Sequence, residues 1–106
     1  MRGVPFEVLA KAGAGFYCDA APFFRHNEDI VIGRNVFMGR HVHISAPCRI
    51  GDDVMLASRV AFVGGDHVFS RPRVPINQSG RGPSRPIIVG SDVWIGHAAI
   101  LMAGVN

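Results

Sequence analysis

The stretch from Ile30 to Val63 reads IVIGRNVFMGRHVHISAPCRIGDDVMLASRVAFV. Every sixth residue in it is apolar, and the same spacing resumes further along the chain: Ile32, Met38, Ile44, Ile50, Leu56 and Phe62, then Val89, Ile95 and Leu101. A helix repeats every 3.6 residues and a strand every 2.0, so neither explains a period of six. A hexapeptide period is typical of a parallel β-helix, in which the chain winds as a prism.

The other positions of each hexad support this interpretation. The fifth position is also apolar, with Val36, Val42, Cys48, Val54, Val60, Val93 and Ala99. The first and fifth side chains are therefore expected to point inward, and the mostly polar third and fourth to lie at corners. Asn35, Asp53 and Asp92 share the fourth position, and Asn and Asp tolerate the left-handed backbone of tight corners. The sequence predicts an all-β triangular prism with three hexads in each coil.

The register divides the chain into parts. Residues 1–25 keep it poorly and are predicted to form an N-terminal cap, which leaves a β-helix domain over residues 26–106. Residues 64–88 interrupt it, because the step from Phe62 to Val89 spans 27 positions where one hexad takes 6. These 21 extra residues, rich in Gly, Pro and Arg, predict an extruded loop inserted at a corner. The hexad rhythm predicts further coils after Asn106, so we expect either that the natural chain is longer or that a partner covers this end.

Composition limits the possible functions. The 106 residues carry a net charge of +3 with 11 Lys and Arg, of which only Lys11 is lysine. Arginine suits phosphates and carboxylates, although solvated surface charge is the simpler interpretation. No basic run indicates nucleic-acid binding, and Cys18 and Cys48 have no metal or redox spacing. Neither a signal peptide nor a membrane-length apolar segment is present, so a cytoplasmic location without membrane contact is expected.

His67 is the sharpest catalytic candidate. It follows Gly64, Gly65 and Asp66 at the start of the loop, directly after a predicted rigid coil. A neutral imidazole there can accept a proton from a hydroxyl or amine near pH 7. From position alone, a histidine on a surface loop with no chemical role is the favoured interpretation.

Three runs of sequence carry a resemblance to a known family. They are IVIGRNVF at 30–37, IGDDVM at 50–55 and PIIVGSDVWIG at 86–96, with His67 in the loop between the last two. This combination resembles the hexapeptide-repeat O-acetyltransferases over about residues 20–105, in particular those that act on galactosides, maltose, nodulation factors and polysaccharide precursors. The resemblance implies a left-handed parallel β-helix.

The resemblance also implies a mechanism. Acetyl-CoA and a small hydroxyl acceptor would bind in a cleft between two subunits of a homotrimer. His67 would act as general base, and the acceptor would attack the thioester directly, without an acyl-enzyme. A backbone N–H or polar side chain would stabilise the oxyanion. No metal is expected.

The remaining site residues follow from the same resemblance. Trp94 would form an apolar wall for the pantetheine arm or the acetyl group, with Gly96 and His97 beside the cofactor. His97 departs from the family, which places a small hydroxyl residue there. Asp19, His41 and Asp66 would contact the acceptor, although His41 stands near a family asparagine.

Three alternatives remain open on the sequence alone. A drug-modifying acetyltransferase would share the same chemistry. A zinc protein like the gamma-class carbonic anhydrases would share the prism, but the spacing of His41, His43 and His67 does not match that pattern. A β-helix scaffold without catalysis is the third.

Overall fold

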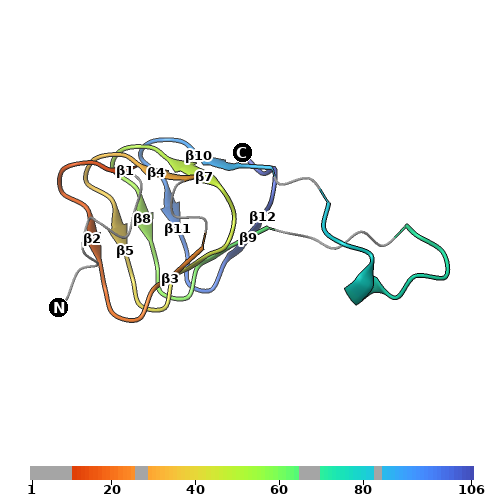
Figure 1. Cartoon of the computed structure of the whole chain (residues 1–106). Coiled ribbons are helices and arrows are strands. Elements are labelled where there is room, and N and C mark those ends of the chain that lie inside the picture. The colour runs from red at the N-terminus through yellow and green to blue at the C-terminus, as the bar shows by residue number, and fades with distance from the viewer. Residues whose placement is uncertain (1–10, 26–28, 65–69, 83–84) are drawn as a thin grey trace.

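The computed structural model describes residues 11–25, 29–64, 70–82 and 85–106. Over these ranges the chain winds through four coils of three short strands each, and Figure 1 shows the coils stacked into a prism. The strands are β1 (Lys11–Ala12), β2 (Tyr17–Cys18), β3 (Phe23–Phe24), β4 (Ile30–Ile32), β5 (Phe37–Met38), β6 (His43–Ile44), β7 (Cys48–Ile50), β8 (Met55–Leu56), β9 (Ala61–Val63), β10 (Ile87–Val89), β11 (Trp94–Ile95) and β12 (Ile100–Met102). The predicted left-handed parallel β-helix is confirmed.

Three parallel sheets form the faces of the prism. Sheet A has the order β1-β4-β7-β10, sheet B the order β11-β8-β5-β2 and sheet C the order β12-β9-β6-β3. Each residue pairs with the one a full coil later, so that Ile32 lies beside Ile50 and Met38 beside Leu56. Three hexads therefore make one coil, as the period of six predicts.

The core is built from the predicted inward positions. The buried first and fifth residues are Ile32, Val36, Met38, Val42, Ile44, Cys48, Ile50, Val54, Leu56, Val60, Phe62 and Val89. Val93, Ile95 and Leu101 of the fourth coil are only partly buried and pack against this core. Stacking the coils removes these apolar side chains from water along the prism axis, and this burial stabilises the fold.

The corners adopt the backbone expected of them. Asn35, Asp53 and Asp92 have φ values of 55°, 57° and 58°, which confirms the left-handed fourth position. The third residue bonds to the next coil along the chain: the backbone N–H of Arg34 donates to Asp52 Oδ1 at 2.8 Å. That bond, followed by the charge of Arg34, lowers the pKa of Asp52.

The predicted start of the β-helix at residue 26 is wrong. Residues 11–25 already form a coil, since Lys11 pairs with Val31 in sheet A and β2 and β3 pair with β5 and β6. Ala12 lies beside Ile32, twenty positions along the chain, whereas the step from the second coil to the third is eighteen. The two additional residues fall at the corner before β4 and shift the phase of the hexads. Residues 1–10 lie outside the described residues, so a cap there stays a prediction.

The long insertion lies where the sequence places it, with a small change of boundary. Strand β9 ends at Val63 and β10 begins at Ile87, so Ile87 and Ile88 belong to the prism and not to the loop predicted over 64–88. Ile87 pairs with Cys48, which is the register that the preceding coil predicts. The described part of the loop at 70–82 projects away from the prism (Figure 1). It contains one short 3₁₀ helix, η3 (Ile76–Gln78).

Small residues at the second position let the coils approach closely, which gives a first prediction. A Cβ added at Gly51 would lie 2.8 Å from the carbonyl group of Gly90 and 2.6 Å from Ser91 Oγ. Gly51→Ala should therefore lower the free energy of unfolding by about 1–3 kcal/mol, as overpacking does. Gly90 occupies the same hexad position with nothing within 4 Å in the described residues, so Gly90→Ala should change it little. Urea titration of both variants measures the difference, and equal stabilities would contradict the packing.

Candidate functional site

Trp94 lies on the outer face of sheet B and is 76% exposed. It is the last of a row of large side chains, one from each coil. Each of these residues comes directly before an inward-facing residue in the sequence. Tyr17 pairs with Phe37, Phe37 with Met55, and Met55 with Trp94. The rings of Tyr17 and Phe37 stack with centroids 5.4 Å apart. Sheet B thus presents an apolar outer face. Outward side chains of a solvent-exposed sheet are usually polar, so this face is unusual.

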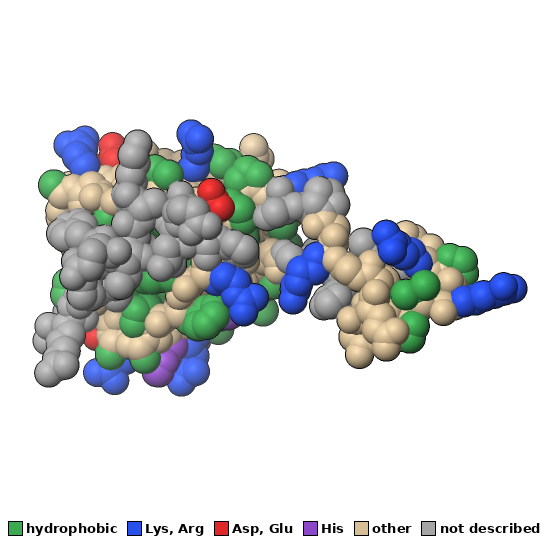
Figure 2. Space-filling model, viewed as in Figure 1, with side chains coloured by type: hydrophobic (Ala, Val, Ile, Leu, Met, Phe, Trp, Pro, Cys, Tyr) green, Lys and Arg blue, Asp and Glu red, His purple; other side chains and the backbone are tan. Residues whose placement is uncertain are grey.

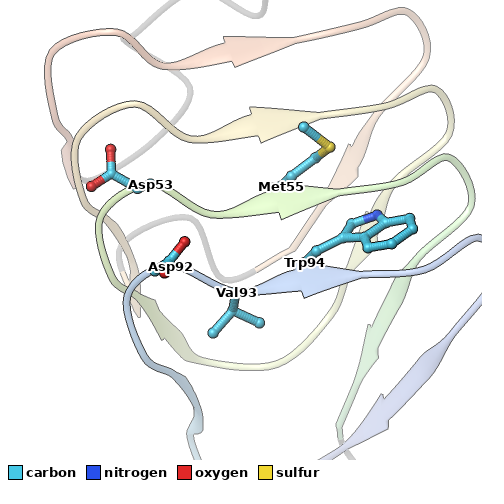
Figure 3. A pocket seen from close by; sticks show the side chains of 5 residues that line it. All are labelled: Asp53, Met55, Asp92, Val93 and Trp94. Atoms are coloured by element: carbon cyan, nitrogen blue, oxygen red, sulfur yellow. The ribbon is translucent and has the colours of Figure 1, made fainter.

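A shallow groove lies between this apolar face and the corner that joins sheets A and B. Its lining consists of Asp53, Met55, Asp92, Val93 and Trp94, and its volume is about 480 Å³. Figure 3 shows both carboxylates at the corner and the indole at the other side, with Met55 one coil away. We call this the Trp94 groove. It offers an apolar wall on one side and two negative charges on the other.

The two carboxylates are placed by the corner geometry. Asp53 and Asp92 occupy equivalent positions in successive coils, and Asp92 N donates to Asp52 O at 2.9 Å. Asp53 Oδ1 accepts from Asn35 Nδ2 at 3.2 Å, so an amide and two acids form a column along this corner. Among the described residues, neither Asp53 nor Asp92 forms a salt bridge. They are available to hydrogen-bond donors or cations.

Four of the predicted site residues lie elsewhere, on the corner that joins sheets B and C. Asp19 Oδ1 accepts from Ala20 N at 2.8 Å, and Asp19 Oδ2 lies 3.6 Å from Arg40 Nε. His41 sits one coil along, where its N–H donates to Ala20 O at 3.1 Å. Gly96 and His97 are at the same corner in the fourth coil. Since neighbouring strands are about 4.8 Å apart, three coils separate Asp19 from His97 by about 14 Å.

The structure therefore joins some predicted residues and separates others. Asp19 and His41 are neighbours, as are Trp94, Gly96 and His97, but the two groups lie at different levels of the prism. None of Asp19, His41, Gly96 and His97 lines the Trp94 groove. Asp66 and His67 lie outside the described residues, so their predicted roles stay predictions.

The groove contains residues that sequence reasoning missed as site residues. Asp53 and Asp92 were expected only as corner residues, and Met55 was assigned no role. The sequence did contain a signal for the groove, namely a large side chain just before an inward position in every coil. When hexads one coil apart are aligned, these side chains form one row: Tyr17, Phe37, Met55 and Trp94. A row of this kind appears only when the repeats are compared across coils and not along the chain.

The two cysteines are buried in the core of the prism. Both side chains are buried, and burial raises the pKa of Cys18 to about 11 and that of Cys48 to about 12, with the charge of Asp19 adding to the effect at Cys18. The thiolate is the reactive form. A direct reaction that uses neither thiol is consistent with this placement.

A second prediction follows from these thiols. At pH 8 neither should react with an aromatic disulfide reagent in the folded protein, whereas both should react in urea. Because their folded pKa values exceed the ordinary 9.0, the stability that they contribute is complete below about pH 9 and is lost as pH rises towards 11–12. Absorbance at the reagent's wavelength measures the reaction, and rapid labelling of the folded chain would contradict the burial.

Comparison with known proteins supports the resemblance. No protein-family model matches the chain. Galactoside O-acetyltransferase of Escherichia coli (strain K12) is 28% identical over 102 residues, which cover 94% of this chain and 49% of that protein. The chain resembles the hexapeptide-repeat acetyltransferases. Nodulation protein L of Rhizobium meliloti (strain 1021) is 27% identical over 114 residues, covering 94% of this chain and 54% of that protein. The chain thus spans about half the length of these two relatives.

A solved structure shares the fold. It is a point mutant of AntD, an N-acyltransferase from Bacillus cereus in complex with dTDP and coenzyme A. The TM-score is 0.54 at 17% identity, over 90% of this chain and 64% of that one. Among the described residues, no helix is long and apolar enough to cross a membrane, and no three His, Cys, Asp or Glu side chains are grouped to hold a metal ion.

Proposed function

We propose that this chain transfers an acetyl group from acetyl-CoA to a hydroxyl of a sugar or similar small acceptor. The observation that carries the proposal is the sequence similarity to galactoside O-acetyltransferase along 94% of the chain. The similarity includes the region of the loop and the hexad that bears Trp94. The β-helix shared with an N-acyltransferase that was solved with coenzyme A is compatible with it.

In the proposed mechanism, His67 acts as general base. Its neutral imidazole accepts the proton of the acceptor hydroxyl as the oxygen attacks the thioester carbonyl. The new O–C bond forms, the C–S bond breaks, and the proton on the imidazole passes to the departing thiolate. A backbone N–H steadies the charge that develops on the carbonyl oxygen. Asp66, next to His67 in sequence, contacts the acceptor.

The other residues bind the two substrates. Trp94 supplies an apolar wall for the pantetheine arm or acetyl group, and Gly96 and His97 lie beside the cofactor. Asp19 and His41 contact the acceptor, where the Asp19 carboxylate accepts hydrogen bonds from sugar hydroxyls. Arg40 Nε, 3.6 Å from Asp19 Oδ2, helps to orient this carboxylate.

The site is proposed to form between copies of the chain in a homotrimer. In one copy, the loop leaves the corner between sheets C and A, because it follows β9 and precedes β10. Trp94 stands on sheet B, the face opposite that corner. A second copy is proposed to bring the loop and Trp94 together, in a threefold ring that supplies one cleft for each subunit.

The test is CoA release from acetyl-CoA, followed with a thiol reagent, across a panel of acceptors. Galactosides, glucosides and oligosaccharides represent the hydroxyl class, and amino sugars the amine class. Acceptor-dependent release with a hydroxyl compound is expected. Release only with amines would replace the proposal with N-acetylation, and acetyl-CoA binding without release on any acceptor would favour a scaffold.

A further inference from the structure

The corner that joins sheets B and C is basic. Its third and fourth hexad positions carry Arg40 and His41 in the second coil, Arg59 in the third and His97 in the fourth, and all four residues are exposed. Figure 2 shows basic and histidine side chains together along the lower edge of the prism, where Figure 1 shows the chain turning from sheet B into sheet C. Among the described residues, Asp19 is the one acid of this corner. We call this surface the basic corner.

The backbone of the basic corner does not explain its charge. The corner between sheets A and B has the same left-handed fourth position, and there it carries Asp53 and Asp92, the residue type that this backbone favours. In the basic corner the fourth position of the third coil is Arg59, with a φ of 65°. Arginine has no short side chain to stabilise that conformation. Its presence suits a contact with a molecule outside the chain.

Arg59 is placed to make such a contact. Its backbone N–H donates to Arg40 O at 2.8 Å, which fixes its backbone to the coil before it. Among the described residues Arg59 forms no salt bridge, whereas Arg40 Nε lies 3.6 Å from Asp19 Oδ2. Two guanidinium groups against one carboxylate leave the basic corner positive even with neutral histidines. His41 occupies the same hexad position one coil away, about 4.8 Å along the prism.

The level of Arg59 relates it to the proposed reaction. The residues proposed to contact the acceptor, Asp19 and His41, lie in the first and second coils, and those beside the cofactor, Trp94 and His97, lie in the fourth. Arg59 lies in the third coil, between the two groups. His41 and His97 are also positions at which this chain departs from the hexapeptide-repeat acetyltransferases, and both departures add an imidazole to the basic corner.

We propose that the acceptor is an anionic sugar, with a carboxylate or phosphate near the hydroxyl that is acetylated. Arg59 binds this oxyanion with the planar fork of its guanidinium, which matches two oxygens at once. His41 donates a further hydrogen bond from its ring, and Arg40 adds positive charge while it holds Asp19. The inference rests on the proposed function for its reaction, and it narrows the acceptor from sugars in general to uronates and sugar phosphates.

Matched acceptors test this specificity. CoA release is measured with methyl galactoside, with methyl galacturonide and with galactose 1-phosphate, which place no charge, a carboxylate and a phosphate on one sugar. At least one anionic sugar should exceed the neutral one in kcat/KM by about ten- to a hundredfold, the usual effect of hydrogen bonds to a charged group. The carboxylate and phosphate arms show which oxyanion is preferred. Equal kcat/KM on all three sugars would overturn the inference and leave acetyl transfer standing.

Variants of Arg59 assign the preference to this residue. Arg59→Gln should bring the ratio of kcat/KM between the anionic and neutral sugars close to one, and Arg59→Lys should keep part of it because the charge remains. Arg49→Gln is the matched control, since Arg49 is exposed in the same coil but on sheet A, and it should leave the ratio unchanged. An unchanged ratio in Arg59→Gln, with a raised KM for acetyl-CoA, would assign Arg59 to the CoA phosphates and overturn the inference.

Calorimetric titration separates this inference from the reaction itself, because binding needs no turnover. In the presence of CoA, the preferred anionic sugar should bind the chain about ten- to a hundredfold more tightly than methyl galactoside, and Arg59→Gln should remove the difference. Tight binding of the anionic sugar without CoA release from acetyl-CoA would support the anion site and contradict acetyl transfer. Equal binding of the neutral and anionic sugars would overturn the anion site, whatever the outcome for acetyl transfer.

Discussion

His67→Ala should lower the rate of acetyl transfer by about 10²–10⁴-fold, the usual contribution of a general base. The reason is that no other group is proposed to take the proton from the acceptor hydroxyl. Steady-state CoA release at saturating acetyl-CoA and acceptor measures the loss. The KM for acetyl-CoA should change much less than kcat, because the proposed role of His67 is on the acceptor oxygen.

His43→Ala is the matched control for this variant. His43 is on sheet C, where its ring stacks on Phe23 with centroids 4.7 Å apart, and it has no proposed role in the reaction. Its removal should leave kcat within a few-fold of the parent. A His67→Ala enzyme with nearly the parental rate would remove the histidine from the mechanism and leave only the binding residues.

Phe62→Ala should lower the free energy of unfolding by about 3–5 kcal/mol. The side chain is fully buried in the core of the third coil, where it pairs in register with Ile44 below and Leu101 above. Its loss leaves a cavity on the prism axis that neighbouring coils cannot fill without breaking their strand pairing. Urea unfolding followed by far-ultraviolet circular dichroism measures the change.

Phe23→Ala is the comparison, since Phe23 is 46% exposed on the outside of sheet C. It should cost much less, limited to its ring contacts with His43 and Arg25. Equal losses in the two variants would mean that the hexad's first position does not carry the core.

The fold was predictable because one periodicity encodes both core and corner. Residues such as Ile50 and Val54 must be apolar because they face the axis, and Asp53 must tolerate a left-handed backbone at the corner. Both requirements repeat at the same positions of each hexad, so they are visible in the sequence. The first coil escaped this reasoning. Its repeat to the second coil is twenty residues, and a two-residue shift at one corner is enough to hide the phase of Ala12 and Cys18.

The candidate site was less predictable for a physical reason. Residues such as Met55 and Trp94 meet across coils, at separations that include the 21-residue insertion, so no local pattern in the sequence joins them. Asp53 and Asp92 have a sufficient structural explanation as corner residues, which conceals the groove that they line. His67 was selected by resemblance and lies outside the described residues.

The nature of the bond formed in the product tests the central proposal most directly. Radiolabelled acetyl-CoA is incubated with the chain and the best sugar acceptor, and the labelled product is separated from acetyl-CoA. It is then treated with alkaline hydroxylamine, which cleaves esters and leaves amides intact. Release of the label as acetyl hydroxamate is expected, at a rate of formation that depends on His67. A label that resists hydroxylamine, or one that never passes to a hydroxyl acceptor, would contradict O-acetyl transfer.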